Sequence, residues 1–260
     1  MELVYSQLVG LLTALWWPFC RIMAMLFAAP VLGEAMVPPT VRVLLALILS
    51  ITMLPVAHAP AAIDPLSLHG VVTTIEQVVI GGVLGLAFHL AMSATMLLGY
   101  LVSSQMGLAM AAMNDPINGT ASDVVSSLLN ILFILVFFSI DGHLVLAGVL
   151  GASFRAWPIG GGIEYLALQA MAFNVAWVFS AALLLALPIV FSALVVQLGF
   201  GFFNRIAPSL NLFSLGFSLV TLFGLVMLTQ LVRYAPEHYL RMTNQVLEML
   251  HHSLRVGSHG

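Results

Sequence analysis

Two apolar stretches of this sequence are too long to cross a membrane once as an upright helix. Residues 72–104 would form a helix of about 50 Å at roughly 1.5 Å per residue, whereas the hydrocarbon core of a bilayer is about 30 Å thick. The second stretch lies between Glu164 and Arg205 and has no formal charge between these ends. Pro188 within it predicts a kink. Each stretch must therefore tilt strongly, break, or extend beyond the bilayer.

The composition indicates that both stretches belong to an integral membrane protein. Hydrophobic residues make up 62% of the 260 residues and charged residues only 7%, against roughly 25% charged residues in a soluble domain. No segment combines enough length and charge to form a separate soluble domain. The formal net charge of -3 is small and dispersed, which argues against binding to nucleic acid. The lone Cys20 excludes an internal disulfide.

Hydropathy predicts an all-α protein with about six hydrophobic runs that form long helical hairpins in a single domain over residues 1–260. The runs are residues 8–29, 41–56, 72–104, 124–154 with a break at 141–143, 164–205 and 212–232. We divide the chain into N-terminal hairpins (1–104), a central loop (105–123), C-terminal hairpins (124–232) and a tail (233–260). The apolar positions of the tail have the spacing of an amphipathic surface helix.

The central loop begins with three methionines at helical spacing. If the chain is helical there, Met106, Met110 and Met113 lie on one face, because they follow each other at i, i+4 and i+7. Asn114-Asp115-Pro116 then ends any helix, and Asn118-Gly119 favours a turn. The stripe can be read as a deformable seal next to a polar hinge, or as core methionines followed by an ordinary loop. Composition alone favours the second interpretation, since methionine commonly fills gaps.

Charged residues inside the first hairpin need partners. Arg21 and Arg42 lie at comparable depth in its two runs, and an arginine inside a span costs roughly 2.5–3.5 kcal/mol on insertion scales. Glu34, in the connection between the runs, is the nearest candidate partner. The alternative is that both arginines extend to one membrane interface.

A face of small residues in the third run predicts close helix packing. Gly81 and Gly85 are four residues apart, and His89 continues the same face. Such faces allow helices to approach closely. We interpret His89 as a hydrogen-bonded packing residue rather than a ligand.

The sequence contains no recognisable nucleophile and base, no phosphate-binding glycine loop and no metal motif, so we expect neither an enzyme nor a cofactor. Glu76, Asp141 and His143 are ionisable residues within the apolar runs and are therefore candidates for function. Asp141-Gly142-His143 could relay protons, bind a partner helix or mark the interfacial end of a span. A secondary transporter with Glu76, His89 and Asp141 as its proton relay is an alternative function, although no convincing internal repeat supports it.

Several segments together resemble the family of the flagellar biosynthesis protein FliR and the T subunit of virulence type III export gates. The resemblance runs from about Leu3 to Leu250 in the order and spacing of the family. The segments are Phe19-Cys20-Arg21-Ile22, Ala29-Pro30-Val31-Leu32-Gly33-Glu34, Val37-Pro38 with Val41-Arg42, Glu76 with Ile80 to Gly85, Gln105-Met106-Gly107-Leu108-Ala109 with Asp115-Pro116, Asp141-Gly142-His143, and Asn204 to Phe213 with Gly216.

The resemblance implies a non-catalytic subunit of the flagellar type III export gate in the bacterial inner membrane, at the flagellar basal body. Members of this family assemble with FliP and FliQ around a pore, and FlhB wraps the closed entrance. The pore passes unfolded rod, hook and filament proteins. The helices are tilted hairpins in a helical assembly, which explains the overlong runs. A virulence export gate is the alternative, although Asp141-Gly142-His143 favours the flagellar one.

The resemblance also implies residue roles. With it, the deformable-seal interpretation of the methionines becomes the favoured one. The pore plug is implied at Met106, Gly107, Met110, Met113, Asn114, Asp115 and Pro116. Contacts to other subunits are implied at Arg21, Glu34, Arg42, Glu76, Gly81, Gly85, Asp141, His143, Arg205 and Asn211.

Overall fold

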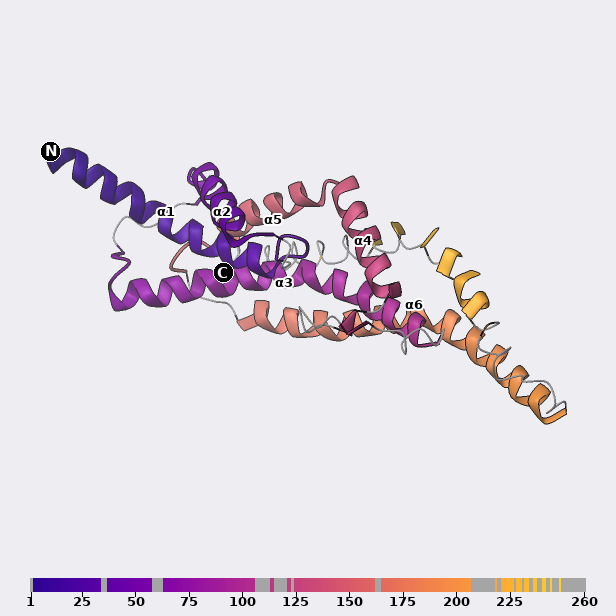
Figure 1. The fold of residues 1–260 in the computed structure, drawn as a ribbon. Helices are drawn as coiled ribbons and strands as arrows, with labels where there is room; N and C mark the ends of the chain where they lie inside the picture. Colours follow the sequence, from indigo (N-terminus) through magenta and orange to yellow (C-terminus); the bar gives the residue numbers. More distant parts are fainter. Residues whose placement is uncertain are drawn as a thin grey trace. The chain divides into compact units, whose positions relative to one another are not determined.

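The described part of the chain is almost entirely α-helical (Figure 1). The computed structural model describes residues 2–33, 37–57, 63–105, 113–114, 121–122, 124–161 and 165–206, with separate helical positions between 218 and 248. The helices are α1 (Glu2–Ala28), α2 (Pro39–Met53), α3 (Leu68–Gln105), α4 (Val124–Ser139), α5 (Gly142–Ala156) and α6 (Tyr165–Ile206). The predicted all-α fold is confirmed, with one small addition. The two-residue strands β1 (Met113–Asn114) and β2 (Ala121–Ser122) pair antiparallel.

Within the described residues, three helical segments are long and apolar enough to cross a membrane. They are Gln7–Ala28, Leu68–Ser104 and Ala186–Phe203, and α4 with α5 would add a fourth span interrupted between them. Both overlong stretches are continuous helices. At about 1.5 Å per residue, α3 measures roughly 57 Å and α6 roughly 63 Å. Of the three possibilities left by the sequence, breaking is therefore excluded for α3 and α6, and the helices must tilt or extend beyond the bilayer.

Local sequence explains several helix boundaries. Pro39 occupies the start of α2, where its missing amide hydrogen costs nothing and its fixed φ suits a helix. Asp141 separates α4 from α5 in a left-handed conformation (φ 55°), and its carbonyl accepts a hydrogen bond from the Leu144 amide at 2.8 Å. Pro18 and Pro188 lie inside α1 and α6 without ending them.

The chain divides into two compact units, each built from separate parts of the sequence. The first contains Met1–Leu90, Phe138–Asn174 and Thr243–Gly260, and the second contains Ala91–Phe137 and Val175–Met242. Each unit therefore takes helices from both the N-terminal and the C-terminal half of the chain.

Each unit has its own apolar core. In the first, the buried side of α1 includes Trp17 and Ile22, which are at most 1% exposed, and α1 packs along α2. In the second, α4 buries Leu129, Phe133 and Phe137, which recur every four residues on one face of the helix. The end of α3 meets α4 there, because the Ser126 hydroxyl donates to the Met96 carbonyl at 3.2 Å.

Candidate functional site

A buried arginine joins three helices of the first unit. Arg21, on α1, is 0% exposed. Its Nε donates to Gln77 Oε1 on α3 at 2.8 Å, and its Nη1 donates to Ser153 Oγ on α5 at 3.3 Å. Its Nη2 donates to the carbonyl oxygen of Trp157, just beyond α5, at 2.8 Å. The guanidinium therefore links α1, α3 and the end of α5 through one planar group.

The surroundings of the guanidinium compensate for the loss of water. The carbon of the guanidinium lies 4.3 Å from the centre of the Phe154 ring, a distance at which the ring face attracts a cation. The carboxylate of Glu76, one position before Gln77 on α3, acts electrostatically on Arg21 and is itself buried. A buried charge is tolerated only when it is paired and hydrogen-bonded. We call Arg21, Glu76, Gln77, Ser153, Phe154 and Trp157 the arginine cluster.

Two glycines allow α3 to approach α1 closely enough for this cluster to form. A Cβ added to Gly81 would collide with the carbonyl oxygen of Arg21, and one added to Gly85 would collide with that of Met25. The predicted close approach at Gly81 and Gly85 is confirmed, and the approaching helix is α1 of the same chain. Their contact with another subunit stays a prediction.

The second arginine of the hairpin is also enclosed. Arg42, on α2, is 7% exposed, and its guanidinium carbon lies 5.0 Å from the centre of the Phe27 ring on α1. The alternative in which Arg21 and Arg42 extend to one interface is therefore wrong, since both guanidinium groups are held between helices. Glu34, the partner expected from the sequence, lies outside the described residues.

The predicted plug is only partly described. Met113 and Asn114 form β1, with Met113 opposite Ser122 and Asn114 opposite Ala121. Helix α3 ends at Gln105. The prediction that Met113 continues the helical face is therefore wrong. The backbone of Met113 pairs with Ser122 in a two-strand ladder instead of forming helical hydrogen bonds. Met106, Gly107, Met110, Asp115 and Pro116 lie outside the described residues.

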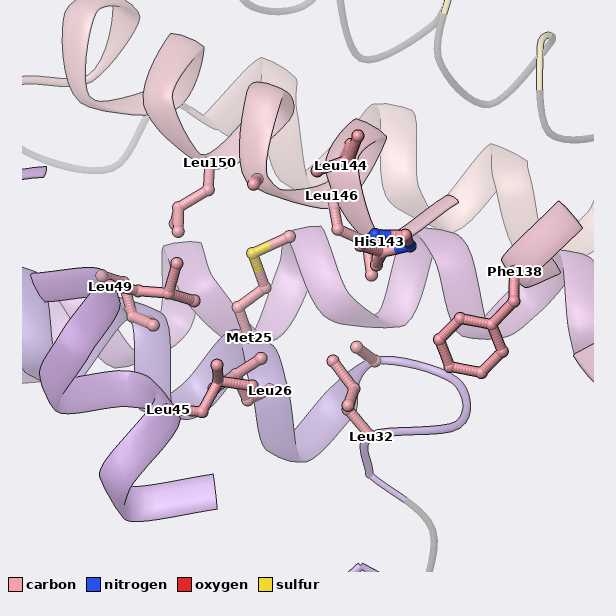
Figure 2. Close-up of a pocket in the computed structure, with 13 residues that line it drawn as sticks. Met25, Leu26, Leu32, Leu45, Leu49, Phe138, His143, Leu144, Leu146 and Leu150 are labelled. Atoms are coloured by element: carbon pink, nitrogen blue, oxygen red, sulfur yellow. The ribbon is translucent and has the colours of Figure 1, made fainter. Parts of the chain in front are cut away.

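Asp141 and His143 lie at the break between α4 and α5. Both are exposed, and the His143 ring lies 5.9 Å from the Phe138 ring, with 42° between the ring planes. His143 also lines an apolar cavity of the first unit (Figure 2). Because both side chains are exposed, they can contact a partner helix or lipid headgroups at the end of a span. These are two of the three roles that the sequence left open for Asp141-Gly142-His143.

Of the two remaining predicted contact residues, Arg205 and Asn211, only Arg205 is described. Arg205 is exposed in the last turn of this helix, where a positive charge complements the helix dipole. Asn211 lies outside the described residues.

Sequence reasoning missed three members of the arginine cluster that belong to α5 and its end, and it missed Gln77. A signal for Gln77 was present, since Gln77, Gly81 and Gly85 follow each other at four-residue steps on one face of α3. No comparable signal marks Ser153. Among the described residues, no group of three or more His, Cys, Asp and Glu side chains could hold a metal ion.

Comparison with known proteins assigns the chain to a family. The sequence profile of the bacterial export proteins, family 1, matches residues 12–246. The flagellar biosynthetic protein FliR of Pectobacterium carotovorum subsp. carotovorum is 36% identical over 246 residues, covering 94% of each chain. The protein of the same name from Escherichia coli (strain K12) is 30% identical over 234 residues, covering 89% of each chain. That from Bacillus subtilis (strain 168) is 25% identical over 229 residues, covering 86% of this chain and 87% of its own.

The match runs through both compact units and covers every helix of the arginine cluster. The sequence resemblance agrees with this match, and so does the predominantly helical, membrane-compatible structure of the described residues. The chain therefore belongs to the bacterial export proteins, family 1, as a membrane-embedded member of the FliR family of the flagellar type III export apparatus.

Proposed function

We propose that this protein is a structural, non-catalytic subunit of the flagellar export gate in the bacterial inner membrane, at the flagellar basal body. In this role it forms, with FliP and FliQ, the pore through which unfolded rod, hook and filament proteins leave the cell, and FlhB binds at the entrance. The observation that carries the proposal is the match to proteins named flagellar biosynthetic protein FliR along 94% of the chain.

The surface of α6 supports an assembled state. Between residues 183 and 206, many large apolar side chains are exposed in the single chain, among them Leu184 (66%), Phe191 (67%) and Phe202 (66%). Contiguous exposed apolar surface of this kind marks contacts with other proteins or with membrane. The stretch Ala186–Phe203 is long and apolar enough to cross a membrane, so lipid can cover part of this surface, and we assign the remaining part to FliP or FliQ.

The seal of the pore is assigned to the central loop. Residues 106–116 connect the end of α3 to the region before α4, and they carry the methionines whose side chains have several low-cost rotamers. Within the central loop, Met113 and Asn114 pair with Ser122 and Ala121 in the short β1–β2 ladder. Unbranched thioether side chains can close around one another and repack around a passing polypeptide.

Copurification tests the proposal. The tagged chain is produced together with FliP, FliQ and FlhB and extracted in a mild detergent, and the extract is analysed by native mass spectrometry. We expect one stable hetero-oligomer containing this chain, and we expect the chain to restore motility to a strain that lacks its own FliR. A chain that stays monomeric in the presence of FliP and FliQ, or that restores secretion of virulence proteins instead of motility, would overturn it.

A further inference from the structure

A cavity of about 290 Å³ lies inside the first unit, between α1, α2 and α5 (Figure 2). Thirteen residues line it, and His143 is the one lining residue with a polar side chain. A polar ligand buried there would lose its hydrogen bonds to water without replacement. The lining therefore selects a hydrocarbon group.

The cavity has a buried floor and an exposed rim. At the floor, Met25 and Leu150 are 3% and 2% exposed, whereas Phe138 and Leu144 at the rim are 46% and 61% exposed. His143 lies with the rim residues and is itself exposed. Figure 2 shows Leu49 and Leu150 on one side of the group of side chains and Phe138 on the other, with His143 between Leu150 and Phe138. The single polar side chain is thus at the open end, as a ligand with an apolar tail and a polar head requires.

We propose that this cavity binds one acyl chain of a membrane phospholipid, with the headgroup at the His143 rim. Its α1 wall, formed by Ile22, Met25 and Leu26, belongs to the end of a segment long enough to span a membrane, and headgroups lie at the ends of spans. The neighbouring outer face of α2 carries Leu44, Leu47 and Ile48, which are 44–58% exposed. Lipid therefore has access next to the α2 residues that line the cavity.

The size of the cavity favours an alkyl chain over a side chain from a partner protein. A cavity of about 150 Å³ in another protein accommodates benzene, so a single leucine or phenylalanine side chain would fill only about half of 290 Å³. A flexible alkyl chain can fill an elongated space of this volume and leave through the open end into the bilayer.

Photolabelling tests the assignment. The full-length chain, in its complex if one forms, is reconstituted into phosphatidylethanolamine and phosphatidylglycerol vesicles. These contain a phosphatidylethanolamine with a diazirine near the end of one acyl chain. After illumination, labelled peptides are identified by mass spectrometry. We expect label on residues 22–32 and 143–150 to saturate as the probe fraction rises, because one site is filled. Label on the outer face of α2 should rise in proportion to the probe.

Two adjacent residues of α5 provide a matched pair of variants. Ala147 lines the cavity, so Ala147→Phe fills part of it. A Cβ at Gly148 would meet no atom within 4 Å, so Gly148→Phe adds a similar bulk outside. We expect the amount of saturable label to fall at least tenfold in Ala147→Phe and to stay at the wild-type level in Gly148→Phe. Unchanged saturable label in Ala147→Phe, or wild-type label that never saturates, overturns the proposal.

A separate measurement distinguishes a lipid in the cavity from a segment of a partner protein. It does not depend on whether Ala147→Phe folds. A photoactivatable amino acid replaces Leu144 at the rim in the otherwise unchanged complex. We expect it to crosslink to phospholipid, detected as a mass increase on the peptide. A crosslink to FliP, FliQ or FlhB in place of lipid would show that a partner segment occupies the cavity, and would overturn the lipid assignment.

Discussion

Replacing Arg21 with alanine removes the side chain that joins α1, α3 and the end of α5. The guanidinium makes three hydrogen bonds, at 2.8, 3.3 and 2.8 Å, and lies over the Phe154 ring. The side chain is fully buried, so in the variant water from the protein surface does not reach the groups that lose these contacts. The substitution also leaves the nearby Glu76 carboxylate without the cation that acts on it.

The expected loss of stability is about 4 kcal/mol. Hydrogen bonds to charged groups contribute about 1.5–3 kcal/mol each, and removing one partner of a buried charged pair typically costs about 3–5 kcal/mol. These two figures are not added, because the hydrogen bonds and the charge pair are one interaction and the variant no longer loses free energy by burying the guanidinium, so the range of about 3–5 kcal/mol applies. Arg21→Lys keeps the charge but cannot reach three acceptors with one planar fork. We expect it to lose about half as much.

Thermal unfolding of the purified chain or complex in a mild detergent, followed by circular dichroism, measures the effect. Since about 1 kcal/mol shifts the Tm of a chain of this size class by roughly 2–4 °C, Arg21→Ala should lower the Tm by roughly 10 °C. Arg155→Ala is the control, because Arg155 is an exposed arginine on α5 and surface substitutions usually change stability by less than about 0.5 kcal/mol. If both variants unfold at the same temperature, the arginine cluster does not stabilise the first unit.

Further predictions concern packing, assembly and the seal. Gly81→Val should sharply reduce the yield of folded protein in detergent extracts, because its side chain would collide with the α1 backbone, whereas Gly82→Val, with no atom within 4 Å of its Cβ, should not. Arg205→Ala should reduce the amount of complex recovered with FliP and FliQ without changing the conductance of the complex that does form, and a normal yield would contradict the predicted contact. Deleting Met110 to Asn114 should leave the complex assembled but permeable to small ions, measured as membrane conductance of cells that produce all partners. Replacing Met106, Met110 and Met113 by leucine should have a milder effect, because volume and hydrophobicity are nearly kept, and a deletion variant that stays as tight as wild type would exclude this loop as the seal.

The sequence predicted the helical architecture because that information is local. The long apolar runs at residues 72–104, with Glu76 as their one charged residue, and between Glu164 and Arg205 appear as the uninterrupted helices α3 and α6. The four-residue spacing of Gly81 and Gly85 predicted a face for close approach, since every residue on one helix face is set by the helix period. The prediction that Met113 lies on a helix failed because its structure depends on a contact that is not local in sequence. Whether a short segment is helix or strand depends on a pairing partner, here Ser122, that helical spacing does not reveal.

The sequence by itself thus determined the fold class, the membrane location and the helix faces available for packing. The tertiary structure alone decided which groups meet Arg21. Its hydrogen-bond partners lie 56, 132 and 136 residues away along the chain, and Glu34, the acid nearest in sequence outside its helix, could be proposed only from proximity. The same holds for the cavity beside His143, whose walls come mainly from α1, α2 and α5, with Phe138 added from α4. A helix period fixes the direction of each side chain on its own helix, but only the packing of helices distant in sequence fixes what lies opposite.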